Sequence, residues 1–111
     1  MKINTQNYGN VTVAEMHGEF ITEFAHTFNK KMTDLVDEGK DGIVLDFSNV
    51  GFLDSRALEV LMELRDYSAS NACQLKIAGL DENCAKILEI TRLDENFDKY
   101  TELAEAVKSF A

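Results

Sequence analysis

One stretch, residues 42–64 (GIVLDFSNVGFLDSRALEVLMEL), constrains the fold more than any other part of the chain. Its first apolar run, residues 43–45, is short and β-branched, which is typical of a strand buried on both faces. Asp54 and Ser55 follow, and both residue types are favoured at the N-cap of a helix. Residues 57–64 are then mostly apolar and predict that helix. At such a junction between a buried strand and a helix, α/β domains present groups to ligands or partners.

Strand-like and helix-like patterns alternate along the rest of the chain. Thr22 is a candidate N-cap for the helix that follows the opening hairpin, and Gly39 suits the left-handed position that ends it. Asp81 or Asn83 can cap a later helix in the same way. The predicted order is strand 1–8, strand 11–16, helix 22–38, strand 43–47, helix 55–67, strand 73–77, helix 81–91, minor strand 97–100 and helix 101–110.

This order predicts a single α/β domain over residues 1–111. Strands that alternate with helices form a mostly parallel sheet, to which the opening hairpin adds an antiparallel edge. With 45% hydrophobic residues, the chain can bury a core without a disulfide or a metal. We predict that Val44 and Leu45 are buried in a central strand over residues 43–47. The next helix is expected to begin within a residue or two of Ser55.

The chain is acidic, because 20 Asp and Glu residues against 11 Lys and Arg residues give a net charge of −9. This charge argues against non-specific binding of nucleic acid and against attraction to an anionic membrane surface. It is compatible with a solvated acidic surface or with a partner that has a basic face. The sequence has no apolar run of the about 20 residues that cross a bilayer, so we expect no membrane insertion.

No recognisable metal-binding spacing joins the two histidines and the two cysteines, which are His17, His26, Cys73 and Cys84. We therefore expect neither a metal nor another cofactor. The cysteines form no CxxC motif and no signal peptide precedes them. A reduced, cytoplasmic compartment fits them best.

Asp46 and Asp54 each have two possible roles. A carboxylate inside an apolar strand is costly unless it is hydrogen-bonded or lies at the strand's C-terminal end, where α/β sheets bind ligands. Asp46 is therefore either a site residue or bonded to the turn that follows it. Asp54 is the N-cap of the helix or a contact for a partner, and both can hold. We expect Asp46, Asp54 and the helix start to form one exposed mouth that presents Ser55.

Ser55 either begins the helix or, as the family resemblance described below implies, accepts a phosphate, which the free N–H groups and the dipole of a helix start would favour. Arg56 can hold such a phosphate, or it can pair with Asp54 or Glu59 at the surface. A phosphate beside two acids would repel an acidic partner surface.

Leu58 and Met62 widen the apolar face of the helix beyond one stripe. They are either core residues or part of an exposed patch for a partner. Catalysis is not expected, because Asp46, Asp54 and Ser55 have no His or Lys base at a recognisable spacing and no glycine-rich phosphate loop accompanies them.

Residues 45–55 (LDFSNVGFLDS), followed by an apolar helix that begins with Ala57 and Leu58, resemble the signature of the STAS domain. This is the family of bacterial anti-sigma factor antagonists. Residues 75–97 resemble the family's later strand and helix, and Gly18 matches an early Gly-containing turn. The resemblance covers nearly the whole chain. It implies a STAS-like α/β fold, in which helices pack mainly on one side of a mixed, mostly parallel sheet.

The resemblance implies a regulatory binding module of bacterial transcription control and not an enzyme. Such antagonists bind a serine kinase that also serves as the anti-sigma factor, and this binding frees the sigma factor. The kinase phosphorylates a hydroxyl at the helix start, the antagonist is released, and a phosphatase restores it. The residues expected to contact the partner are Asp46, Asp54, Ser55, Arg56, Leu58 and Met62.

The sequence departs from the family's pattern directly after Ser55. The family usually has a second Ser or Thr and then Gly, where this chain has Arg56 and Ala57. If the first hydroxyl of the pair is the acceptor, Ser55 remains; if it is the second, Arg56 has removed it. A methyl group at Ala57 would also keep a partner backbone at a distance. The alternatives are an antagonist switched by phosphorylation of Ser55 and an unphosphorylated STAS scaffold subunit in a lipid-transport or signalling complex.

Overall fold

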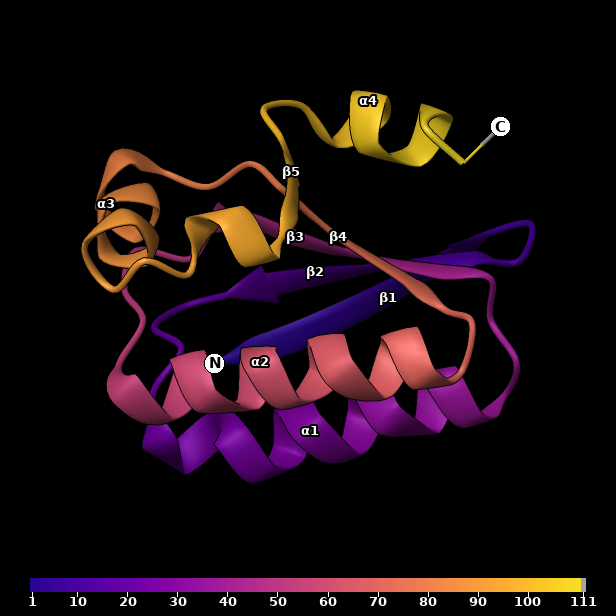
Figure 1. Cartoon of the computed structure of the whole chain (residues 1–111), viewed down its shortest axis with the longest axis horizontal. Helices are drawn as coiled ribbons and strands as arrows, with labels where there is room; N and C mark the ends of the chain where they lie inside the picture. Colours follow the sequence, from indigo (N-terminus) through magenta and orange to yellow (C-terminus); the bar gives the residue numbers. More distant parts are fainter. Residues whose placement is uncertain (111) are drawn as a thin grey trace.

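The structure, a computed structural model, describes residues 1–110 and shows a five-stranded sheet with helices on both faces (Figure 1). The predicted order of elements is confirmed. The elements are β1 (Lys2–Tyr8), β2 (Val11–His17), α1 (Thr22–Asp37), β3 (Gly42–Asn49), α2 (Ser55–Ser70), β4 (Gln74–Ala78), α3 (Glu82–Ile90), the 3₁₀ helix η1 (Asp94–Asn96), β5 (Asp98–Tyr100) and α4 (Leu103–Lys108).

The strands lie in the order β1-β2-β3-β4-β5. β1 runs antiparallel to β2, and every other neighbouring pair is parallel. This confirms a mixed, mostly parallel sheet with an antiparallel edge. The central strand β3 pairs on both sides, so that Asp46 stands between Glu15 of β2 and Ala78 of β4.

Both faces of β3 are covered, as its apolar run predicts. Successive side chains of a strand point to opposite faces. Leu45 belongs to the larger core beneath α1, α2 and α3, whereas Val44 belongs to a smaller core beneath α4. Both side chains are fully buried, which confirms the prediction for the central strand. Three helices therefore pack on one face and α4 alone covers part of the other (Figure 1).

Helix α1 packs through the apolar stripe that its sequence predicts. The ring of Phe28 lies 4.7 Å from that of Phe20, and the ring of Phe24 lies 5.8 Å from Phe20 in an edge-to-face arrangement. Gly39 has the expected positive φ of 82° just after the helix. The expected N-cap is wrong, because Ile21 occupies that position and Thr22 is the first helical residue. The N–H of Thr22 finds its acceptor elsewhere in the chain, as described below.

The C-terminal segment covers the second face through contacts of Ser109 and Phe110 with Lys76 of β4 and Gly42 of β3. Lys76 is buried, and its Nζ donates to Ser109 Oγ at 2.5 Å and lies 4.4 Å from the centre of the Phe110 ring. That ring rests directly on Gly42, the first residue of β3. A side chain at position 42 would occupy the space of the ring. Among residues 1–110, none of the helices combines the length and the apolar character needed to cross a membrane.

We predict that Gly42→Ala lowers the free energy of unfolding by about 1–3 kcal/mol, because its methyl group overpacks the site of the Phe110 ring. Gly51→Ala is the matched control, since a Cβ at Gly51 meets no atom within 4 Å. Its effect is expected to stay within about 0.5 kcal/mol. Urea denaturation of the two variants measures the difference. Equal stability of both variants would show that Phe110 does not pack on Gly42.

Candidate partner-binding site

The connection from β3 to α2 is held in place by the segment that precedes α1. Phe20 and Leu53 form a parallel β-bridge. Phe20 N–H donates to the carbonyl of Phe52 at 3.0 Å, and Asp54 N–H donates back to the carbonyl of Phe20 at 3.1 Å. Because Phe20 and Leu53 are also buried, this short bridge anchors the start of α2 to the start of α1.

The side chain of Asp54 joins the N-terminal ends of both helices. Its Oδ1 accepts the N–H of Ala57 at 2.9 Å, which is the N-cap bond of α2. Its Oδ2 accepts the N–H of Thr22 at 2.8 Å and the hydroxyl of Thr22 at 2.9 Å. The prediction that Asp54 caps α2 is confirmed. Its second role, as the cap that α1 itself lacks, was not predicted.

These hydrogen bonds favour the ionised form of Asp54. The N–H of Ala57 is the main cause that holds the pKa of this carboxyl below its usual value of 3.8, and the bonds from Thr22 lower it further. Asp54 is therefore a carboxylate at neutral pH, placed where helix starts favour negative charge.

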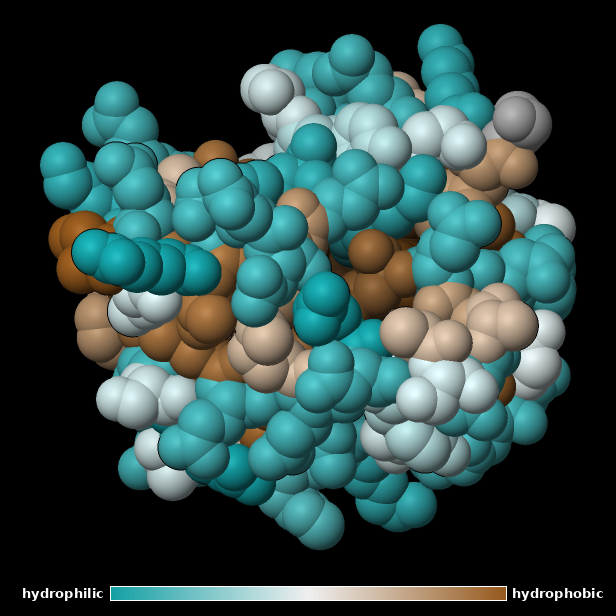
Figure 2. Space-filling view, viewed as in Figure 1, coloured by the Kyte–Doolittle hydropathy of each residue, from teal (hydrophilic) through white to brown (hydrophobic). Residues whose placement is uncertain are grey.

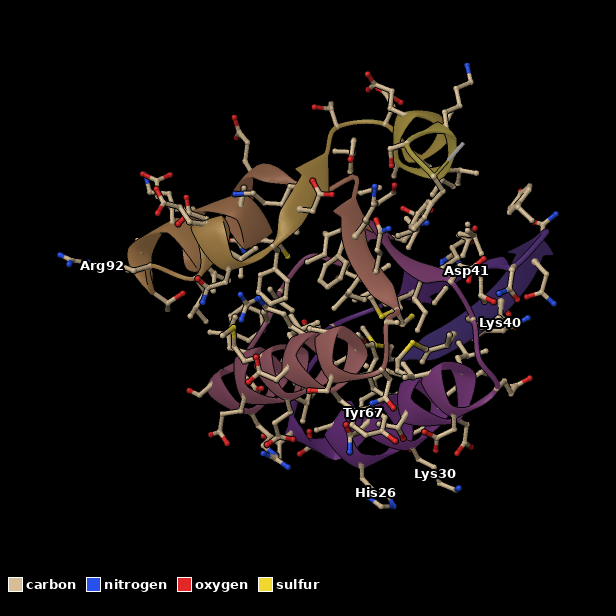
Figure 3. The ribbon with its side chains drawn as sticks, turned by 45° about the vertical axis from the view of Figure 1, so that its right-hand side comes forward. His26, Lys30, Lys40, Asp41, Tyr67 and Arg92 are labelled. Atoms are coloured by element: carbon tan, nitrogen blue, oxygen red, sulfur yellow. The ribbon has the colours of Figure 1, made fainter. Side chains whose placement is uncertain are left out.

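A second hydrogen bond holds the other end of the helix pair. The hydroxyl of Tyr67 on α2 donates to Asp37, the last residue of α1. Figure 3 shows Tyr67 on the side of α2 that lies next to α1. This bond raises the pKa of the Tyr67 hydroxyl, because the carboxylate favours the protonated phenol. The two helices are thus joined by polar contacts at both ends and by apolar contacts between them.

Ser55 is the first residue of α2 and is exposed, as predicted. Arg56 is exposed as well, but its side chain runs along the helix and away from its start. Arg56 Nη1 donates to Glu59 at 3.0 Å and to Glu63 at 3.5 Å. Of the two predicted partners, Glu59 is therefore confirmed and Asp54 is not. Surface pairs of this kind contribute at most about 1 kcal/mol.

Ala57 faces the interior. Its side chain is fully buried in the larger core, and its N–H is held by Asp54. The expectation that its methyl group hinders the approach of a partner is therefore wrong. The methyl group packs against the core instead of enlarging the exposed surface.

Asp46 does not share a mouth with Asp54, which corrects that expectation. Asp46 lies between Leu45 and Phe47, whose side chains belong to the larger core beneath α1 and α2. Because successive side chains of a strand point to opposite faces, Asp46 lies on the same face as Val44, beneath α4. It is 6% exposed, and its Oδ1 accepts the N–H and the hydroxyl of Ser48 at 3.0 and 2.6 Å. The structure therefore favours the local bond to the turn over a role beside Ser55.

Leu58 and Met62 are partly buried and pack against the larger core. Met62 Sδ also accepts a weak hydrogen bond from Asn96 Nδ2 at 3.6 Å. Figure 2 shows apolar surface between α3 and the start of α2. Phe52, which is 41% exposed, and Ile90, which is 70% exposed, are the large apolar side chains that sequence reasoning missed. The signal for Phe52 is its place beside the buried Leu53 in an extended bridge, where neighbouring side chains point in opposite directions.

The described residues offer no arrangement for metal or thiol chemistry. Within residues 1–110, no group of three or more His, Cys, Asp and Glu side chains is placed to hold a metal ion. Burial raises the pKa of Cys84 to about 12, and it also raises the pKa of Cys73. Both thiols therefore stay protonated at neutral pH, and a protonated thiol is a poor nucleophile.

The sequence matches the STAS domain family over residues 2–106, and the chain therefore belongs to this family. A comparison with curated proteins gave no significant match.

Several solved structures share this fold. A Thermotoga maritima protein described as a candidate anti-sigma factor antagonist is 24% identical, with a TM-score of 0.90 over 96% of this chain and 92% of that one. The Bacillus anti-sigma factor antagonist SpoIIAA, in its phosphorylated form, is 14% identical, with a TM-score of 0.76 over 99% of this chain and 100% of its own. A sulfate transporter family protein from Wolinella succinogenes is 15% identical, with a TM-score of 0.76 over 90% of this chain and 84% of that one. At these identities the comparisons establish the fold.

We predict that Asp54→Ala lowers the free energy of unfolding by about 2 kcal/mol at neutral pH, because it removes a cap from two helices. Asp81→Ala is the control, since Asp81 caps α3 alone through the N–H of Cys84 at 2.7 Å. It is expected to cost about 1 kcal/mol.

The difference between the wild-type protein and Asp54→Ala should depend on pH. Because the folded state lowers the pKa of Asp54, its contribution is complete above the usual value of 3.8 and is lost as the pH falls through the lowered pKa. Denaturant unfolding at neutral pH and at acid pH measures both effects. If Asp54→Ala and Asp81→Ala lowered the free energy of unfolding equally at neutral pH, Asp54 would not cap both helices.

Proposed function

We propose that this chain is a non-enzymatic, regulatory protein-binding module of the anti-sigma factor antagonist type. Its partner would be a serine kinase that also acts as an anti-sigma factor, and binding would release the sigma factor. The observation that carries the proposal is the start of α2, where Asp54 and the Phe20–Leu53 bridge hold an exposed Ser55 in a fixed position. A rigid, exposed hydroxyl at a helix start suits recognition and reversible phosphorylation.

The proposed contact surface surrounds this hydroxyl. It combines the exposed apolar ring of Phe52, the half-buried Leu58 and Met62, and the charged ends of Arg56 and its glutamate partners. An aromatic anchor with a charged rim is the usual composition of a protein–protein interface. The net charge of −9 favours a partner that is basic overall. The proposed switch requires acidic partner groups opposite Ser55 itself, so that a phosphate on Ser55 repels them.

Phosphorylation of Ser55 would act by electrostatic repulsion. The ionised Asp54 stands directly before it, and the guanidinium of Arg56 is already bound to Glu59 and Glu63. A phosphate would therefore add about −1.5 to −2 charges beside a carboxylate, and Arg56 could neutralise them only by leaving its glutamate partners. The modified surface would lose affinity for the kinase, and a phosphatase would restore it. Such a cycle would take place in the cytoplasm, where the kinase uses ATP.

The second candidate is an unphosphorylated STAS scaffold subunit in a lipid-transport or signalling complex. The observation that favours it is Arg56, which stands where the family usually has a second hydroxyl and is engaged in two surface ion pairs. The structural likeness to a sulfate transporter family protein is compatible with such a role. In that case the same surface around Phe52 would form a permanent contact.

We predict that the cognate serine kinase and ATP add phosphate to Ser55 and that Ser55→Ala abolishes the modification while preserving binding of the kinase. Ser70→Ala is the matched control, because Ser70 is also exposed but ends α2 instead of beginning it. Ser55→Asp is expected to weaken kinase binding by about tenfold or more, because it adds charge at the contact surface. Mass spectrometry of residues 51–65 and titration calorimetry give the two readouts.

Phosphate on another residue, or no phosphate with a kinase shown to be active on another substrate, would exclude the switch. A protein that still binds its partner under those conditions would then act as the unphosphorylated scaffold.

A further inference from the structure

The outer edge of β1 is free along its whole length. β1 pairs with β2 on one side through seven residues, and within residues 1–110 no strand pairs with its other side. Every residue of β1 except Ile3, which packs against the larger core, is exposed, so the helices cover little of this strand. An uncovered edge presents a row of backbone N–H and C=O groups that can pair with another strand.

β1 lacks the devices that usually keep such an edge from pairing. The chain contains no proline, the register with β2 is unbroken from Lys2 to Tyr8, and the only charged residue of the strand is Lys2 at its start. The opposite edge of the sheet has this protection, because β5 is only three residues long and carries Asp98 and Lys99. The two edges of one sheet are thus built differently.

The distribution of charge indicates which strand can pair with this edge. The protein carries a net charge of −9, so most pairs of surfaces from two copies repel each other. Residues 3–14, which form most of the β1–β2 hairpin, contain no charged side chain. Two copies can therefore meet along this hairpin without opposing like charges.

We propose that β1 pairs antiparallel with β1 of a second copy of this chain, which joins the two sheets into one. An antiparallel pair of identical strands is related by a two-fold axis, so the same edge serves both copies and the assembly closes as a dimer. With the axis at Thr5, Lys2 of one copy stands opposite Tyr8 of the other. Both side chains lie on the same face of the strand, and Tyr8 is 46% exposed, which allows a cation–π contact.

The dimer is expected to be weak, because edge pairing buries less than the about 1,600 Å² of a standard interface. Sedimentation velocity of the full chain across about 0.01–1 mM covers the range in which so small an interface dissociates. The pairing leaves the start of α2 outside the contact, so it is independent of the function proposed above.

Thr5→Lys tests the edge directly. It places like charges near the two-fold axis, and it is expected to raise the dissociation constant by at least about tenfold. Thr27→Lys is the matched control, because it makes the same change at an exposed position of α1. Urea unfolding of both variants establishes that each is folded. Amide hydrogen exchange of the wild-type protein gives a second readout, in which protection of β1 rises with protein concentration and protection of β5 does not.

The proposal holds if the wild-type protein and Thr27→Lys dimerise, Thr5→Lys does so at least tenfold more weakly, and β1 becomes protected. A wild-type protein that stays monomeric to about 1 mM would overturn it, and the edge would then be free for an extended segment of a different protein. A dimer that Thr5→Lys does not weaken, or that leaves the β1 amides unprotected, would place the contact elsewhere and overturn it as well. Should Thr5→Lys fail to fold, the concentration dependence of β1 protection decides alone.

Discussion

The rest of this structure depends on the hydrogen bonds that the Asp54 carboxylate accepts. They satisfy N–H groups at the starts of two helices at once. Ile21 at the N-cap of α1 has no side chain that can accept a hydrogen bond, and Asp54 supplies the missing acceptor across the β3–α2 connection. The Phe20–Leu53 bridge brings the two segments together, and the Tyr67 bond to Asp37 holds the far end of the helix pair. These contacts fix α1 and α2 as one unit beneath the sheet.

The hydrogen bonds of Asp54 limit what this residue can offer to a partner. Because both oxygens of Asp54 are engaged within the chain, a partner that took either oxygen would break a helix cap, so Asp54 positions the surface more than it contacts a partner. In the proposed contact, the exposed groups available to the partner would be the hydroxyl of Ser55, the ring of Phe52 and the outward parts of Leu58 and Met62. Regulation by phosphate would then act on a surface whose backbone is already rigid.

The sequence predicted the features that depend on neighbouring residues. It did not predict the contacts between residues that are far apart in the chain. The strand at residues 43–47, the helix start at Ser55 and the cap at Asp54 all follow from periodicity and capping preferences. The bond between Thr22 and Asp54 joins residues 32 positions apart, so no local pattern could reveal it. Asp46 was expected beside Ser55 from its residue type, but side chains alternate along β3, and Asp46 faces the side of the sheet opposite Leu45 and Phe47.

The most direct test of this account is an NMR titration of the Asp54 side-chain carboxyl carbon, followed together with the backbone amides of Thr22 and Ala57. If one carboxylate caps both helices, the carboxyl carbon titrates with a midpoint below the usual value of 3.8, and both amide signals shift with the same midpoint. A midpoint at or above 3.8, or an amide of Thr22 that does not follow the titration, would contradict the double cap. The rigid presentation of Ser55 would then lack its physical basis.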